Sequence, residues 1–147
     1  AHALRIHLER AVEDVGSTAL EIVDETEGLI DTLDPTIRIA LFRIAQEAIN
    51  NAARHSGADH ISVAVKCTKA GLLMKIKDNG QGLPRTGRKR HTSKATGGIA
   101  HMRTRARLIA ARFGMSNTGG TTITVKLPLT SFSFKESAAQ TGTEEPA

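Results

Sequence analysis

A stripe of polar residues runs along the most regular helical pattern in the chain. Glu47 and Asn51 are four residues apart, so in a helix both side chains point the same way, with Asn50, Arg54 and His55 beside them. Carboxylate and amide oxygens suit Mg²⁺, which shares its coordination shell with substrate phosphates. A solvated polar face is the alternative interpretation, but adjacent asparagines are unfavourable inside a helix. The stripe therefore suggests a site for Mg²⁺ and phosphate, with Arg54 and His55 placed to meet phosphate oxygens.

A carboxylate falls on the apolar side of a predicted strand. Residues 72–78 alternate between apolar and polar side chains, and Asp78 continues the apolar series. A buried carboxylate needs a hydrogen-bond donor, and the amino group of adenine is a suitable one. Gly80 and Gly82 would let the backbone approach a flat base. The alternative is an aspartate in an ordinary turn at a strand end.

A pair of glycines, Gly97 and Gly98, leads into a helix that the pattern predicts over about residues 99–113. The first N–H groups of a helix have no partner within the helix, and the helix dipole is positive at that end. Phosphate could therefore approach the glycine backbone closely. An ordinary glycine-rich loop before a helix is the alternative.

The elements that position these residues follow from the spacing of the apolar side chains. In chain order, they are a helix at 3–15, a strand at 18–24, a helix at 36–56, strands at 60–66 and 72–78, a long loop at 80–98, a helix at 99–113 and a strand within 119–129. Asp34 is the expected N-cap of the long helix and Pro35 suits its first turn. We expect a two-layer α/β sandwich, in which helices cover one face of a mixed, largely antiparallel sheet.

Composition narrows the class of partner. The 147 residues suffice for one domain, and the formal net charge of +5 suits an anionic partner such as a nucleotide, a nucleic acid or an acidic protein. The chain has no Trp or Tyr, which disfavours stacking on single-stranded nucleic acid. One cysteine and no long apolar run suggest a cytoplasmic domain. We expect neither nucleic-acid binding nor membrane contact by this domain.

Taken together, four segments resemble the boxes of a known family. These segments are IAQEAINNAARHSGA at 44–58, DNGQG at 78–82, GGIAHMRTRA at 97–106 and GGTTITVKLPL at 119–129. In this order they resemble the N box, the G1 box, the G2 box and the closing strand of the ATP-binding catalytic domain of two-component sensor histidine kinases. This domain has the Bergerat (GHKL) fold. The Met-Arg-x-Arg-Ala signature favours the nitrate-sensor and desaturase-sensor subfamily.

The resemblance implies a role for individual residues. Asn51 would bind Mg²⁺, Glu47 would orient or activate groups around the metal, and Asp78 would bind the adenine amino group with help from Thr121 through water. The residues it assigns to nucleotide binding are Asn51, Arg54, His55, Asp78, Gly80, Gly82, Gly97, Gly98, Ile99 and Thr121.

The resemblance also divides the chain. Residues 1–129 would form the catalytic domain, residues 83–96 would form its basic ATP lid, and residues 130–147 would be a disordered tail. The sequence departs from the family at Thr96, where the G2 box often begins with glycine, and at Ile99, where leucine is usual.

The implied activity is transfer of the γ-phosphoryl group of ATP to a histidine on a separate dimerisation domain, with a response regulator as an indirect partner. None of the six histidines lies in a helix before an acidic residue, so we expect the phosphoacceptor to be absent from this chain. An anti-sigma-factor-type serine kinase of the same fold and a nucleotide-binding pseudokinase remain alternatives. A nucleic-acid-binding module is a more distant one, since it would leave Glu47 and Asn51 without a purpose.

Overall fold

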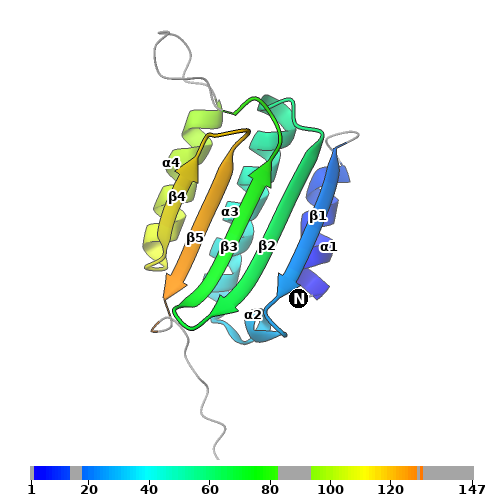
Figure 1. Cartoon of the computed structure of the whole chain (residues 1–147). Helices are drawn as coiled ribbons and strands as arrows, with labels where there is room; N and C mark the ends of the chain where they lie inside the picture. Colours follow the sequence, from blue (N-terminus) through cyan, green and yellow to red (C-terminus); the bar gives the residue numbers. More distant parts are fainter. Residues whose placement is uncertain (1, 14–17, 83–93, 129, 131–147) are drawn as a thin grey trace, which may run out of the picture.

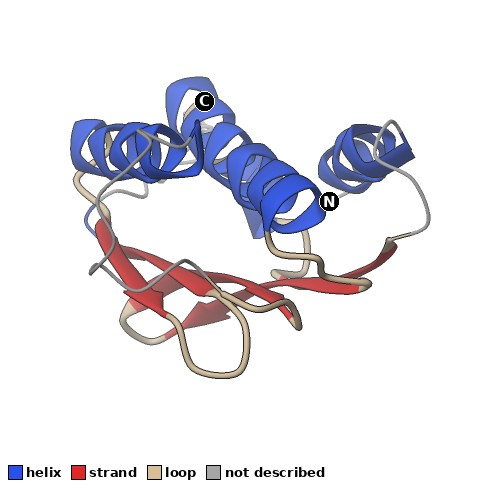
Figure 2. Ribbon diagram, turned by 90° about the horizontal axis from the view of Figure 1, so that it is seen from above, coloured by secondary structure: helices blue, strands red, loops and turns tan. Residues whose placement is uncertain are grey.

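The chain folds into a five-stranded sheet with helices packed on one of its faces (Figures 1 and 2). The computed structural model describes residues 2–13, 18–82, 94–128 and 130. Its elements are α1 (His2–Glu13), β1 (Ala19–Glu25), α2 (Leu29–Thr32), α3 (Pro35–His55), β2 (His60–Thr68), β3 (Gly71–Asp78), α4 (Lys94–Leu108), β4 (Arg112–Ser116) and β5 (Thr122–Pro128). The strand order is β1-β2-β3-β5-β4, and only the β1–β2 pairing is parallel. The predicted two-layer mixed sheet is confirmed.

The central helix α3 begins and ends where the sequence predicted. The Asp34 carboxylate accepts a hydrogen bond from the Thr36 N–H at 2.8 Å, and Pro35 occupies the first turn. Ser56 caps the other end, and Gly57 follows with a φ of 64°. The predicted apolar stripe is buried throughout, comprising Leu41, Ile44, Ala45, Ala48, Ile49 and Ala52.

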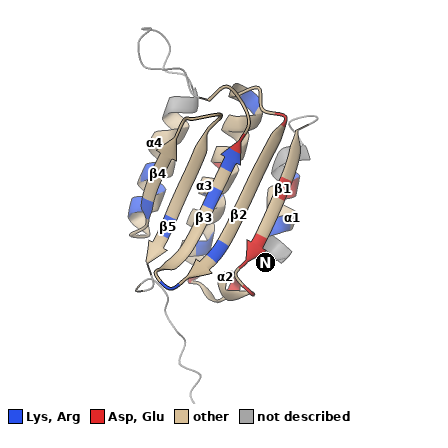
Figure 3. Cartoon of the chain, viewed as in Figure 1, with Lys and Arg blue, Asp and Glu red and all other residues tan. Residues whose placement is uncertain are grey.

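The core lies between the helices and one face of the sheet. Alternate residues of the central strands point into it: Ile61, Val63, Val65, Leu72, Met74, Ile76, Ile123, Val125 and Leu127. The predicted antiparallel pairing of β2 with β3 is confirmed, with Val63 opposite Ile76. The intervening side chains point to the open face, which carries several lysines (Figure 3).

The second long helix differs from its prediction at both ends. Helix α4 begins at Lys94, so Gly97 and Gly98 lie within it and not before it. The helix ends at Leu108, and β4 then forms over residues expected to be helical or loop. Phe113 follows the buried Met102 and Ala106 at a spacing that also fits a helix, which explains the error. Pairing with β5, which places Phe113 opposite Val125, makes this segment a strand.

Parts of two predicted segments fall outside the described residues. These are 83–93 of the expected lid and 131–147 of the expected tail, whereas 94–96 belong to α4. Within the described part of the chain, no helix is long and apolar enough to cross a membrane.

Candidate functional site

Most of the predicted site residues gather at one end of the molecule. There α3 and β3 end and α4 and β5 begin, at the upper end of Figure 1. The four elements come from distant parts of the sequence. Pairing of β3 with β5 and packing of α4 on α3 bring them together.

The polar stripe of α3 faces the first turns of α4. A β-carbon added to Gly98 would overlap the Glu47 Oε1 atom and lie 3.1 Å from Asn51 Nδ2. Glu47 and Asn51 are half-buried and point to the same place, as their spacing predicted. A β-carbon on Gly97 would meet nothing within 4 Å. Only Gly98 therefore needs to be glycine for α4 to sit this close to the stripe.

Two basic residues extend the stripe to the end of α3. Arg54 and His55 lie in its last turn, and both are exposed. Their side chains are therefore free to meet an anionic ligand arriving from solvent. Elsewhere in the described residues, no three His, Cys, Asp or Glu side chains gather in a way that could hold a metal ion. A metal at this end would depend on one or two side chains and on ligands from its substrate.

Asp78 is buried at the end of β3, as its register predicted, with 6% of its surface exposed. Its Oδ1 atom accepts a hydrogen bond from the Gly80 N–H at 2.8 Å and one from the Thr121 N–H at 3.3 Å. Among the described residues, none donates a hydrogen bond to Oδ2. One carboxylate oxygen is thus fixed by the backbone and the other remains available to a ligand.

The strand end around Asp78 depends on glycine at two places. Gly120 has a φ of 104°, and a β-carbon there would overlap the Asp78 backbone carbonyl oxygen. Gly82 has a φ of 75°, and a β-carbon there would overlap the Asn117 side chain. The backbone can run so close to the carboxylate and to Asn117 only without these side chains. Thr121 continues the contact, since its carbonyl accepts a hydrogen bond from the Asp78 N–H at 3.0 Å.

The loop after β3 is also held against the end of α3. The Gln81 N–H donates to the Ser56 carbonyl at 2.9 Å, and a β-carbon on Gly80 would overlap Ser56. Ser56 is itself buried and donates through Oγ to the Ala52 carbonyl at 2.6 Å. The sequence did not single out Ser56, although its position after the helix stripe was visible. It ties the strand that carries Asp78 to the helix that carries Asn51.

A second residue that the sequence did not single out is Asn79. Its Oδ1 atom accepts from the Asp59 N–H at 3.2 Å and the His60 N–H at 3.1 Å. Its Nδ2 donates to the Asp59 carboxylate at 2.6 Å. The asparagine therefore fastens the end of β3 to the start of β2, beside the carboxylate of Asp78. Its place directly after a strand was the available signal.

Replacing Asn79 should lower stability without touching a ligand. Asn79→Ala removes three hydrogen bonds at a partly exposed position, so we expect a loss of about 1–2 kcal/mol in the free energy of unfolding. Chemical denaturation monitored by circular dichroism measures it. Gln81→Ala is the control, because the described contact of Gln81 is made by its backbone N–H. Equal losses in both variants would contradict the role of Asn79.

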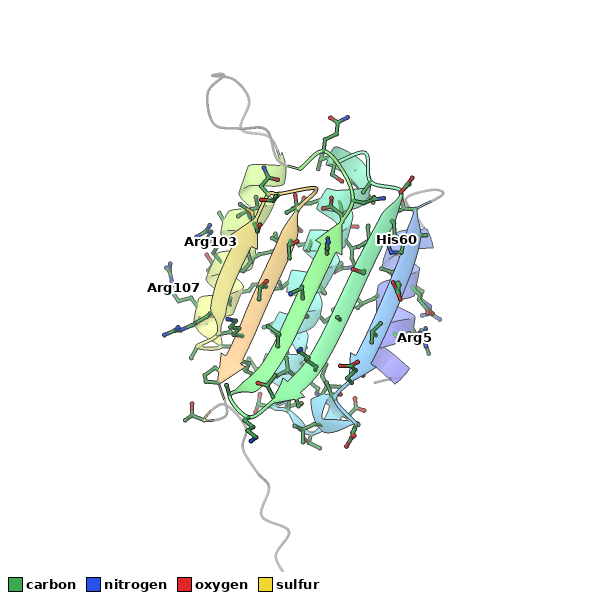
Figure 4. The ribbon with its side chains drawn as sticks, viewed as in Figure 1. Arg5, His60, Arg103 and Arg107 are labelled. Atoms are coloured by element: carbon green, nitrogen blue, oxygen red, sulfur yellow. The ribbon has the colours of Figure 1, made fainter. Side chains whose placement is uncertain are left out.

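The Met-Arg-x-Arg-Ala segment serves mainly to pack α4. Met102 and Ala106 are buried, and Ile99 is half-buried against the core. The Arg103 guanidinium lies 5.3 Å from the centre of the Phe113 ring, a cation–π contact at the β4 edge of the molecule (Figure 4). These residues position the start of α4 and do not themselves extend toward Asp78.

The chain matches the family described as histidine kinase-, DNA gyrase B- and HSP90-like ATPases over residues 36–131. It is 38% identical over 111 residues to the signal transduction histidine-protein kinase/phosphatase DegS of Bacillus subtilis, covering 74% of this chain and 28% of DegS. It is 34% identical over 113 residues to the sensor histidine kinase MctS of Rhizobium johnstonii, covering 76% and 24%. The chain thus spans about a quarter of the length of these relatives. Its fold is similar to the ATP binding domain of PrrB from Mycobacterium tuberculosis, with a TM-score of 0.64, 22% identity and coverage of 85% and 90%.

Proposed function

The chain belongs to the family of histidine kinase-, DNA gyrase B- and HSP90-like ATPases, and we propose that it is the ATP-binding catalytic domain of a sensor histidine kinase. The observation that carries the proposal is the meeting of two features at one end of the sheet. A buried carboxylate with one available oxygen lies on β3, and the paired oxygen donors of α3 face the start of α4. The sensor kinases among its relatives support the assignment.

Asp78 is proposed to select adenine. Its carboxylate can only accept hydrogen bonds when it is ionised, and the exocyclic amine of adenine can only donate. The N–H groups of Gly80 and Thr121 hold Oδ1, which leaves Oδ2 for the base. Gly80 and Gly82 would line the base, and Thr121 would add a contact through water.

The α3 stripe is proposed to hold Mg²⁺ and the phosphates. Asn51 and Glu47 fit the metal, because both supply side-chain oxygens at the point where α4 approaches. When bound, Mg²⁺ would neutralise charge on the phosphates. Gly97, Gly98 and Ile99 would contribute backbone N–H groups from the first turns of α4, and Arg54 and His55 would offer cationic or donor groups. Residues 83–96 are proposed as the lid, residues 1–129 as the domain and 130–147 as its tail.

The transfer reaction would require a second domain. Phosphoryl transfer depends largely on positioning and charge neutralisation, which these residues would supply. The acceptor would be a histidine on the parent kinase's dimerisation domain, with a response regulator downstream. Among the histidines of this chain, His7 precedes Leu8 in α1 and His60 lies on β2. We place the chain in the nitrate-sensor and desaturase-sensor subfamily on its Met-Arg-x-Arg-Ala helix, and its working location in the cytoplasm.

The test is a phosphoryl-transfer assay with labelled ATP, this chain and a separately purified dimerisation domain from a sensor kinase of the same subfamily. We expect ATP binding by the chain alone, and label on the added domain only when Mg²⁺ is present. The linkage should be acid-labile, as phosphohistidine is. Acid-stable label would favour a serine kinase, and binding without transfer would favour a pseudokinase. Stable label on a histidine of this chain alone would contradict the missing phosphoacceptor.

The glycine pair in α4 offers a sharper test of the phosphate end. In Gly98→Ala the new β-carbon would displace Glu47 and crowd Asn51, so we expect Mg²⁺-supported ATP affinity to fall roughly tenfold. Isothermal titration calorimetry with and without Mg²⁺ measures this. Gly97→Ala meets no atom within 4 Å and should raise stability by about 0.5–1 kcal/mol through helix propensity. Unchanged ATP affinity in Gly98→Ala would mean that the α3 stripe does not form the phosphate end.

A further inference from the structure

The open face of the sheet carries an unbalanced group of cations. Five side chains form what we call the basic sheet face: Lys66 of β2, Lys75 and Lys77 of β3, Arg112 of β4 and Lys126 of β5. All are exposed, and they lie on the side of the sheet away from the helices (Figures 2 and 3). Within the described residues, none of them forms an ion pair.

The strand register brings some of these cations directly beside one another. Lys66 is opposite Leu73, Leu73 is opposite Lys126, and Lys126 is opposite Arg112. These residues form one row across β2, β3, β5 and β4. Like charges directly opposite each other on neighbouring strands are destabilising. The arrangement therefore costs stability that a carboxylate at either position would recover, and an anionic ligand would recover it as well.

The carboxylates on this face are confined to the opposite edge. Glu21 and Glu25 project from β1, where Glu25 is opposite Lys66 and Glu21 lies 3.6 Å from the His60 imidazole. In the described strands β3, β4 and β5, the open face carries no acidic side chain. The face is thus positive over most of its width and negative along one border.

We propose that the basic sheet face docks a protein with an acidic surface patch. A finite acidic patch matches a positive area that has a negative border, and such a pattern fixes the orientation of the partner as well as attracting it. An anionic membrane would also meet the β1 carboxylates and repel them. A second copy of the chain would place positive faces against each other. The face lacks the aromatic side chains on which nucleic-acid bases stack.

Docking at this face is compatible with nucleotide binding and does not depend on it. The residues assigned to the nucleotide lie on the helix side and at one end of the sheet, whereas the basic sheet face looks the other way (Figure 2). A partner could therefore remain bound while ATP enters and leaves. Such an interface would be polar and would depend on ionic strength.

The test compares two charge-reversed variants of the whole chain. Lys75→Glu with Lys126→Glu alters the basic sheet face, and Arg38→Glu with Arg107→Glu makes the same change in net charge on the helix layer, where Arg107 points outward (Figure 4). The probe is a fluorescent poly-glutamate peptide, titrated at low and at physiological salt. We expect salt-dependent binding that falls at least about tenfold in the first variant and far less in the second.

Amide chemical shifts on adding the peptide should change on β2, β3, β5 and β4 and not on α3. Equal losses in both variants, or no binding by the wild type, would overturn the proposal. Vesicles of phosphatidylcholine with phosphatidylglycerol are the comparison, and binding to them without binding to the peptide would assign the face to lipid instead. A short DNA duplex tests nucleic acid in the same way. Unchanged ATP affinity in both variants would show that the nucleotide site is intact, so the two proposals can fail separately.

Discussion

Asp78→Asn should lower the affinity for ATP roughly 10–100-fold, and to the same degree with or without Mg²⁺. The amide replaces one acceptor oxygen by an N–H₂ donor, which then faces the donor amine of adenine. A hydrogen bond to a charged group contributes about 1.5–3 kcal/mol, which corresponds to that range of affinity. Calorimetric titration of ATP in both conditions measures the effect.

The same variant should remain folded. An amide oxygen in place of Oδ1 still accepts from the N–H groups of Gly80 and Thr121, so the strand end keeps its hydrogen bonds. Guanine carries a carbonyl where adenine carries its amine, so the preference for ATP over GTP should shrink. Wild-type ATP affinity in a folded Asp78→Asn protein would remove Asp78 from the base pocket, and with it the main support for the proposed function.

Asn51→Ala should remove most of the gain in ATP affinity that Mg²⁺ provides, while binding without the metal changes little. Alanine deletes the amide oxygen proposed to bind the metal and leaves the helix intact, since alanine is the better helix former. We expect about a tenfold loss or more in the presence of Mg²⁺, because Mg²⁺ is held by very few protein ligands. The measurement is the same titration, repeated over a series of Mg²⁺ concentrations.

The neighbouring asparagine provides a matched control. Asn50 is also half-buried in α3, but it belongs to a different face of the helix from Glu47 and Gly98. Asn50→Ala should therefore leave the Mg²⁺ dependence close to that of the wild type. Similar losses in the two variants would assign the effect to the helix as a whole. A normal Mg²⁺ response in Asn51→Ala would contradict the metal role.

Together the two variants separate the halves of the nucleotide. Loss in Asp78→Asn concerns the base, and loss in Asn51→Ala concerns the metal and phosphates. Because the residues lie on β3 and α3, which are joined through Ser56 and Gly80, a variant that disturbs that contact should affect both halves. The pattern of losses therefore also tests whether the site is one continuous pocket.

The sequence by itself determined the elements whose pattern is local. The i, i+3, i+4 spacing of apolar residues defined α3, and Asp34 with Pro35 marked its start. Alternation defined β2 and β3 and placed Asp78 on the buried side. Spacing alone also showed that Glu47 and Asn51 share a face. These features depend on neighbours a few residues away, and such neighbours are visible in a linear pattern.

Only the tertiary structure decided the features that depend on distant partners. Phe113 has a spacing that fits a helix, and it becomes part of β4 because β5 offers hydrogen bonds to that segment. Gly98 proves to be the glycine that faces Glu47 and Asn51, because α4 starts earlier and packs on α3. The opposition of Arg112 and Lys126 follows from strand register. No local pattern specifies which residues meet across such distances, since packing and pairing of whole elements set those contacts.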